Sequence, residues 1–116
     1  MSFDLYAFDL DEMPTDPEAI GDLMENDSRW GAPFTSRLEA FVSELEAAFP
    51  SLDDDPDNSP WASWPLRGDS MVDGHCCGFN ITWSAADSMS VEIRFRASRH
   101  GLTIYDPQAD LVIPPS

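Results

Sequence analysis

The chain contains no lysine, and the few basic residues that it has are all arginine. Six arginines stand against 22 aspartates and glutamates, which gives a formal net charge of −16. A field of this sign repels the phosphates of nucleic acids and the surfaces of anionic membranes. We therefore expect neither a nucleic acid nor a membrane as partner, and we expect a basic protein to be attracted instead.

Cysteine and long apolar runs are also scarce. The only two cysteines, Cys76 and Cys77, are neighbours, so they cannot form an unstrained disulfide and are expected to be buried thiols. No apolar run approaches the ~20 residues that span a bilayer. The start of the chain, residues 1–5, has neither the basic nor the apolar segment of a signal peptide. These absences predict a cytoplasmic protein.

The residues that are present suffice for a folded core. Hydrophobic residues make up 42% of the 116, and they include 4 Trp, 7 Phe and 2 Tyr. This excludes a disordered acidic tail and predicts one domain over residues 1–116.

The N-terminal half predicts a strand at 2–10, a helix at 16–26 and a second helix at 37–49. Thr35 or Ser36 caps the second helix. Its apolar stripe consists of Leu38, Phe41, Val42, Leu45 and Phe49.

Residues 51–66 predict a long acidic loop, because they contain three prolines and a block of aspartates. We expect Trp61 and Trp64 to pin this loop onto the body. Asp53, Asp55 and Asp57 match the first ligand positions of a calcium loop. The glutamate expected at its twelfth position is replaced by Trp64, so we expect no metal site.

The C-terminal half predicts a hairpin over 67–84, with Asp73-Gly74 as its turn, and strands at 102–105 and 111–113. Residues 86–100 are ambiguous, because their apolar residues alternate as in a strand. Arginines near the end of the segment favour a helix, as does Gly101 at its C′ position.

We therefore interpret 86–100 as a helix, which would begin with a capping box formed by Ser84 and Asp87. The resulting order predicts the α+β class, with a single, mostly antiparallel sheet and helices packed on one face. The order contains the split βαβ arrangement of ferredoxin-like folds.

Catalytic chemistry has little support. Asp9 and Asp11 follow a strand as in aspartate-nucleophile phosphatases, but those enzymes need a lysine that is missing here. His75, Cys76 and Cys77 cannot converge on one metal from a strand, because neighbouring side chains point to opposite faces. We predict no catalytic residues and no cofactor. A small metal-dependent enzyme using Asp9, Asp11, His75 and His100 is the alternative.

Four short motifs carry a resemblance that spans most of the chain: Ser2 to Tyr6, Phe49-Pro50, Ser59-Pro60-Trp61, and His100 to Gln108. In these motifs the chain resembles a group of small acidic bacterial proteins with a C-terminal His-Gly-Leu-x-x-Tyr-Asp-Pro-Gln stretch. In size and acidity it is also similar to the immunity proteins of bacterial toxin systems. That likeness implies a protein that covers the active site of a basic toxin.

The expected function is therefore that of an immunity-like inhibitor that binds a basic partner protein such as a toxin. The residues predicted to contact the partner are Asp53, Asp54, Asp55, Asp57, Trp61 and Trp64. A DNA-mimic protein, with carboxylates placed in rows like phosphates, is a further alternative.

Overall fold

The computed structural model describes residues 2–9, 16, 18–20, 22, 34–50, 54–55, 57–62, 72–74 and 76–115. Its elements along the chain are strand β1 (Ser2–Phe8), helix α2 (Ser36–Ala48), strands β2 (Val72–Asp73) and β3 (Cys76–Thr82), a 3₁₀ helix η2 (Trp83–Ala85), helix α3 (Ala86–Arg99) and strands β4 (Thr103–Asp106) and β5 (Leu111–Ile113). No helix among these residues is long and apolar enough to cross a membrane.

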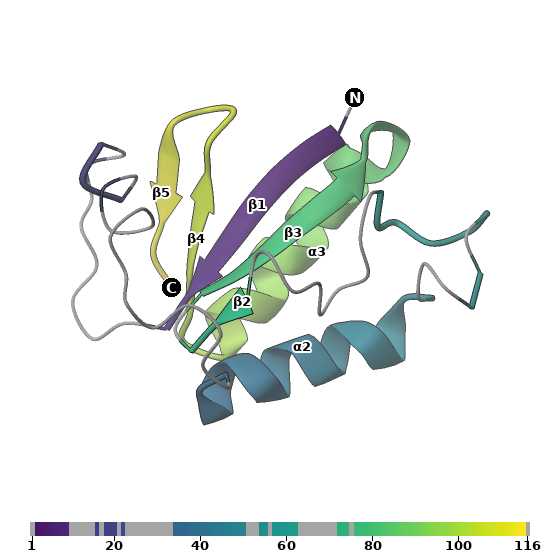
Figure 1. The fold of residues 1–116 in the computed structure, drawn as a ribbon, viewed down its shortest axis with the longest axis horizontal. Helices are drawn as coiled ribbons and strands as arrows, with labels where there is room; N and C mark the ends of the chain where they lie inside the picture. Colours follow the sequence, from purple (N-terminus) through teal and green to yellow (C-terminus); the bar gives the residue numbers. More distant parts are fainter. Residues whose placement is uncertain are drawn as a thin grey trace.

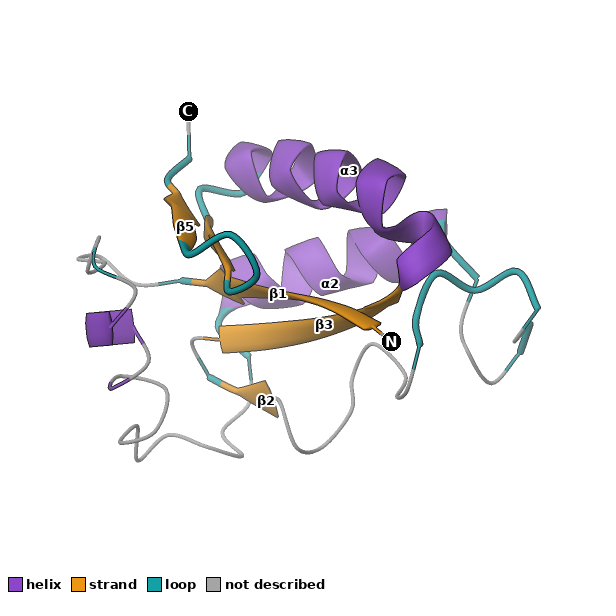
Figure 2. Cartoon of the chain, turned by 90° about the horizontal axis from the view of Figure 1, so that it is seen from above, coloured by secondary structure: helices purple, strands orange, loops and turns teal. Residues whose placement is uncertain are grey.

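The strands form one sheet in the order β2-β3-β1-β4-β5, and every neighbouring pair is antiparallel. Both helices lie on the same side of this sheet (Figures 1 and 2). The predicted α+β class with an antiparallel sheet is confirmed, and α2 and α3 together cover one face of that sheet. The finer prediction of a ferredoxin-like order stays a prediction, because it also concerns the connection through 10–33, most of which lies outside the described residues.

The main core lies between the sheet and the two helices. Alternating residues of the strands point into it, and α2 and α3 each contribute one buried stripe. The fully buried members with the largest side chains include Leu5, Phe41, Leu45, Phe79, Ile81, Ile93 and Ile104. Burial of such side chains stabilises the fold by about 1.5–3 kcal/mol each.

A smaller cluster covers the opposite face of the sheet. Phe8, Cys76 and Tyr105 pack there against Ile20, which belongs to the helical residues 18–20. The carboxylate of Asp16 accepts a hydrogen bond from the backbone N–H of Glu18, so the predicted cap at Asp16 is present.

Both long helices begin and end for identifiable reasons. Thr35 caps α2, because its Oγ1 accepts from the N–H of Leu38. α3 ends in a Schellman motif, in which Gly101 adopts φ +72°. There Leu102 N–H donates to Ala97 C=O, and Gly101 N–H donates to Ser98 C=O. A side chain at position 101 would be strained by this backbone conformation.

Two local predictions need correction. The capping box of Ser84 is wrong: Ser84 lies inside η2, and α3 begins after Ala85 with no side-chain cap. The hairpin turn is displaced by one residue, because Asp73 pairs with Cys76 as the last residue of β2. The helix at 86–100 is confirmed.

Candidate functional site

The described part of the acidic loop is held by Asp55. Its backbone carbonyl accepts from the N–H groups of Asn58 and Ser59, and its carboxylate accepts from Asn58 Nδ2 at 3.1 and 3.2 Å. Asp55 is therefore half-buried and occupied in closing a turn. Asp54 and Asp57 on either side of it are exposed.

Trp61 belongs to the core. It is 2% exposed, forms an isolated bridge with Ile81, and packs its ring against Phe49 and Phe79 at centroid distances of 6.5 and 6.0 Å. This confirms that Trp61 pins the loop, and it corrects the prediction that its side chain contacts a partner. Asp53 and Trp64, the other predicted contacts, lie outside the described residues.

The two described candidate catalytic residues, Asp9 and His100, have different partners. Asp9 accepts a hydrogen bond from Thr35 Oγ1 and lies 3.9 Å from Arg37 Nη1. His100 instead contacts Glu44, at 3.2 Å. Asp11 and His75 lie outside the described residues. Among the described residues, no three His, Cys, Asp or Glu side chains are grouped as metal ligands.

The two cysteines behave as expected from a strand. Cys77 is buried in the core under the helices, and Cys76 is buried in the cluster on the opposite face. Both are reduced thiols, and neither takes part in a disulfide. Their separation by the sheet removes any common metal or nucleophile site for the pair.

An ion-pair cluster joins α2 to α3. Arg96 on α3 contacts Glu44 of α2 at 2.9 Å and Glu92 of its own helix at 3.1 Å, while its guanidinium lies over the ring of Phe49. Burial alone would raise the pKa of Glu44, but hydrogen bonds from His100 and Arg96 outweigh it and lower that pKa. Hydrogen bonds to Glu44 and Glu92 raise the pKa of Arg96. The cluster is therefore a structural clamp, because every member already has a partner.

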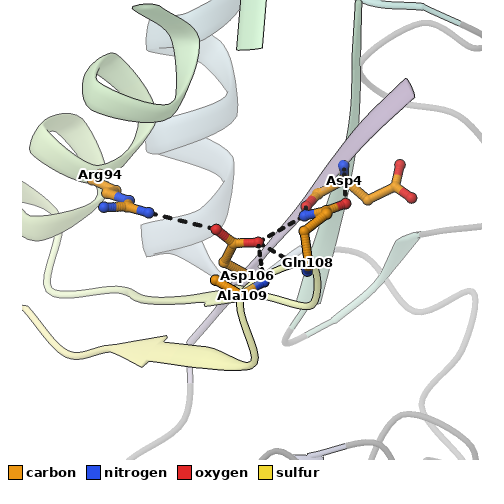
Figure 3. A network of polar contacts seen from close by, with 5 residues as sticks. All are labelled: Asp4, Arg94, Asp106, Gln108 and Ala109. Atoms are coloured by element: carbon orange, nitrogen blue, oxygen red, sulfur yellow. Dashed lines mark hydrogen bonds and ion pairs between the residues drawn. The ribbon is translucent and has the colours of Figure 1, made fainter. Parts of the chain in front are cut away.

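The Tyr-Asp-Pro-Gln stretch contains the last two residues of β4 and the first two residues of the turn to β5. Figure 3 shows Asp106 and Gln108 of this stretch. Extending the β1–β4 register would place Asp4 opposite Pro107, which has no N–H to donate. The side-chain amide of Gln108 takes the place of the backbone partner that Pro107 cannot provide. Its Nε2 donates to Asp4 C=O at 2.7 Å, and its Oε1 accepts from Asp4 N–H at 2.8 Å. The side-chain amide thus continues the ladder of the sheet.

Asp106 fixes this turn from within. Its buried Oδ1 accepts from the backbone N–H and the Nε2 of Gln108, at 3.0 and 2.7 Å, and its Oδ2 lies 3.5 Å from Arg94 Nη2 (Figure 3). The most specific motif of the sequence is therefore explained by structure.

Two tyrosines stack on the sheet beside this turn, with Tyr6 and Tyr105 at a centroid distance of 6.2 Å. Burial raises the pKa of both phenols, and neighbouring carboxylates, among them Asp4 for Tyr6 and Asp110 for Tyr105, raise it further. Both phenols therefore stay neutral near pH 7, which leaves neither as a general base.

The exposed acids are spread over several elements. Those described are Asp16, Glu18, Asp22, Glu39, Glu46, Asp54, Asp57, Asp87 and Asp110. They belong to residues 16–22, to α2 and the loop after it, to the start of α3 and to the β4–β5 turn, and no observation on the described residues favours the DNA-mimic alternative. Glu39 and Glu46 of α2, together with Asp54 and Asp57 of the loop that follows it, form what we call the acidic region.

One cavity lies among residues that the sequence analysis did not select. It occupies about 370 Å³ between α3 and strands β4 and β5. Its lining includes Arg94, Phe95, Arg99, Leu102, Ile104 and Ile113, and we call it the arginine cavity. A signal existed in the sequence: in a helix, Val91 and Phe95 lie roughly 200° around the axis from the Met89–Ile93–Ala97 stripe, which makes a second apolar surface.

Comparisons of the chain with protein-family models, with curated proteins and with solved structures find no match.

Proposed function

We propose that this protein is an acidic binding protein of the immunity type, which neutralises a basic partner protein such as a toxin in the cytoplasm. The acidic region binds the partner, and Asp54 and Asp57 lie at the centre of that contact surface. Asp55 supports the loop from within, and Trp61 holds it against β3.

The observation that carries this proposal is how the arginines are used. Of the four described arginines, Arg37, Arg94 and Arg96 all lie against carboxylates of the same chain. The charges of Arg37 and Arg96 are thus engaged by contacts within the fold and that of Arg94 only in part, while 22 acids against 6 arginines leave an excess of 16 negative charges. Such a field accelerates encounter with a basic protein, from about 10⁵–10⁶ to as much as about 10⁸–10⁹ M⁻¹s⁻¹ at low salt.

The absence of a converging catalytic group among the described residues also favours binding over catalysis. Asp9 is engaged by Thr35 and Arg37, and His100 is engaged by Glu44. Neither side chain faces the arginine cavity.

The test has two parts. The tagged protein is incubated with extract of its source cells at ~50 mM NaCl, and bound proteins are eluted with ~1 M NaCl, where the Debye length falls to about 3 Å. We expect a basic protein in the eluate, and we expect its expression in a host to stop growth unless this chain is co-expressed. Recovery of no basic protein, together with no protection of host cells, would overturn the proposal.

A further inference from the structure

The arginine cavity has an apolar floor in a strongly acidic molecule. Leu102 and Ile104 of the β4 segment are buried, and Ile113 of β5 is half-buried beside them. The volume of about 370 Å³ lies within the range of small-ligand sites, about 300–1,000 Å³. The cavity is therefore large enough for a small organic molecule and too apolar for an inorganic ion alone.

All charged residues that line the arginine cavity are positive. Arg94 and Arg99 contribute to its wall, and no aspartate or glutamate does. The charge of this site is thus opposite in sign to the net charge of the chain, which is −16. Guanidinium groups bind carboxylates in pairs of parallel hydrogen bonds, so this charge selects an anionic head group.

Neither arginine is saturated by the contacts of the described residues. Arg99 has no carboxylate partner among them, and its guanidinium lies over the ring of Phe95 at 5.7 Å from the centroid. Arg94 meets Asp106 at 3.5 Å, and its buried Nε has no acceptor. Arg96 on the same helix differs, since two carboxylates bind it within 3.1 Å. Arg94 and Arg99 therefore still have guanidinium N–H donors without an acceptor among the described residues, and both line the cavity.

Phe95 extends the apolar floor to the surface. Its side chain is 63% exposed at the edge of the cavity, and Val91 one turn earlier is 67% exposed. Exposed large apolar side chains beside a cavity typically mark a binding site. The ring also holds Arg99 through the cation–π contact, so the guanidinium is positioned before a ligand arrives.

We propose that the arginine cavity binds a small amphipathic carboxylic acid. The carboxylate lies between Arg99 and Arg94, and the hydrocarbon part covers Leu102, Ile104 and Ile113. The last carbonyls of α3 would disfavour an anion here, but the Schellman motif already gives partners to those of Ala97 and Ser98. This site shares no residue with the acidic region, so the proposal of a carboxylic-acid ligand does not depend on the proposed function.

The test is a titration of the whole protein with three matched probes, followed by NMR of the methyl groups of Ile104 and Ile113. Octanoate carries both the charge and the chain, 1-octanol carries the chain alone, and acetate carries the charge alone. We expect saturable shifts of these methyls with octanoate, and at least about tenfold weaker binding of 1-octanol and acetate. Equal binding of 1-octanol, or octanoate shifts spread over the whole molecule, would overturn the proposal.

A pair of arginine variants makes the test specific. Arg99→Gln is expected to weaken octanoate about tenfold while leaving the thermal midpoint within a degree or two. Arg37→Gln removes the same charge from an exposed arginine on α2 that does not line the cavity, and it should leave octanoate affinity unchanged. Equal weakening by both variants would show a general charge effect and contradict a built site.

Discussion

The acidic region lies on α2 and the loop that follows it, whereas the arginine cavity lies between α3 and the β4–β5 pair. In the first, exposed carboxylates cover a packed helix. In the second, two arginines and Phe95 border an apolar hollow. The net charge of −16 has the same sign as the first region, but it gives no indication that the second is lined by positive residues. Charge therefore has to be assigned to individual surfaces before it is used to infer partners.

Helix α3 shows the same difference on a smaller scale. Arg96 faces α2 and is bound by Glu44 and Glu92, so it serves the fold. Arg99, one turn further along, rests on an exposed ring. Two arginines of the same helix therefore have different roles, one in stability and one in ligand binding. Variants of each can distinguish these roles.

The largest effect is expected at the clamp that joins the two helices. Arg96→Gln leaves Glu44 half-buried with only His100 as partner, and we expect a loss of about 2 kcal/mol in the free energy of unfolding, measured with urea. Arg37→Gln is the control: its side chain is 61% exposed and its pair with Asp9 spans 3.9 Å, so about 0.5 kcal/mol or less is expected. Equal losses would remove the distinction between structural and exposed arginines.

A smaller loss is expected in the turn beside the arginine cavity. Gln108→Ala removes both bonds to the backbone of Asp4, and we expect about 1 kcal/mol of destabilisation in the same urea experiment. Gln108→Glu keeps an acceptor for the Asp4 N–H but loses the donor, and it adds a charge next to Asp106. It should therefore destabilise at least as much as alanine. Full stability of Gln108→Glu would contradict the role given to the amide.

The clamp also predicts a dependence on pH. The folded-state pKa of Glu44 is lowered, so its contribution to stability is fully present above the ordinary glutamate pKa of about 4.3 and is lost as the pH falls through the lowered value. Glu44→Gln should cost about 0.5–1 kcal/mol near pH 7 and much less near pH 3. A cost that is the same at both pH values would show that charge at Glu44 is unimportant.

The smallest effect concerns salt. Repulsion among the carboxylates should ease as the Debye length falls, so the thermal midpoint is expected to rise between ~10 mM and ~1 M NaCl. Affinity for a basic partner should fall over the same range, since screening weakens attraction between chains. A flat or falling midpoint would mean that internal arginine pairs or bound cations already neutralise the acids.

The sequence predicted most of the fold because its local signals agreed with each other. The stripe from Leu38 to Leu45 and the Thr35 cap both indicate α2, and both are present. Gly101 decided the ambiguous segment, since a glycine at C′ fits the end of a helix. Alternation alone would have made α3 a strand, because Val91 and Phe95 are apolar although they face outward.

The candidate site was predicted less well. Trp61 was assigned both to the core and to the interface, and sequence alone cannot reveal that its ring is enclosed by Phe49 and Phe79. The arginine cavity depends on α3 meeting β4 and β5, which is tertiary packing. Gln108 was noticed only within a motif, because its bonds to Asp4 span 104 residues of sequence.

The most direct measurement compares two variants against two probes, with affinities determined by calorimetry. The first variant, Asp54→Asn with Asp57→Asn, removes two charges from the acidic region, and Asp87→Asn with Asp110→Asn is its control of equal charge. The second variant is Arg99→Gln. We predict that the first variant alone weakens the basic protein recovered from cell extract, by about tenfold or more, and that Arg99→Gln alone weakens octanoate. If the Asp87 and Asp110 control weakens the basic protein equally, or if one variant weakens both probes, the assignment of two separate binding surfaces is wrong.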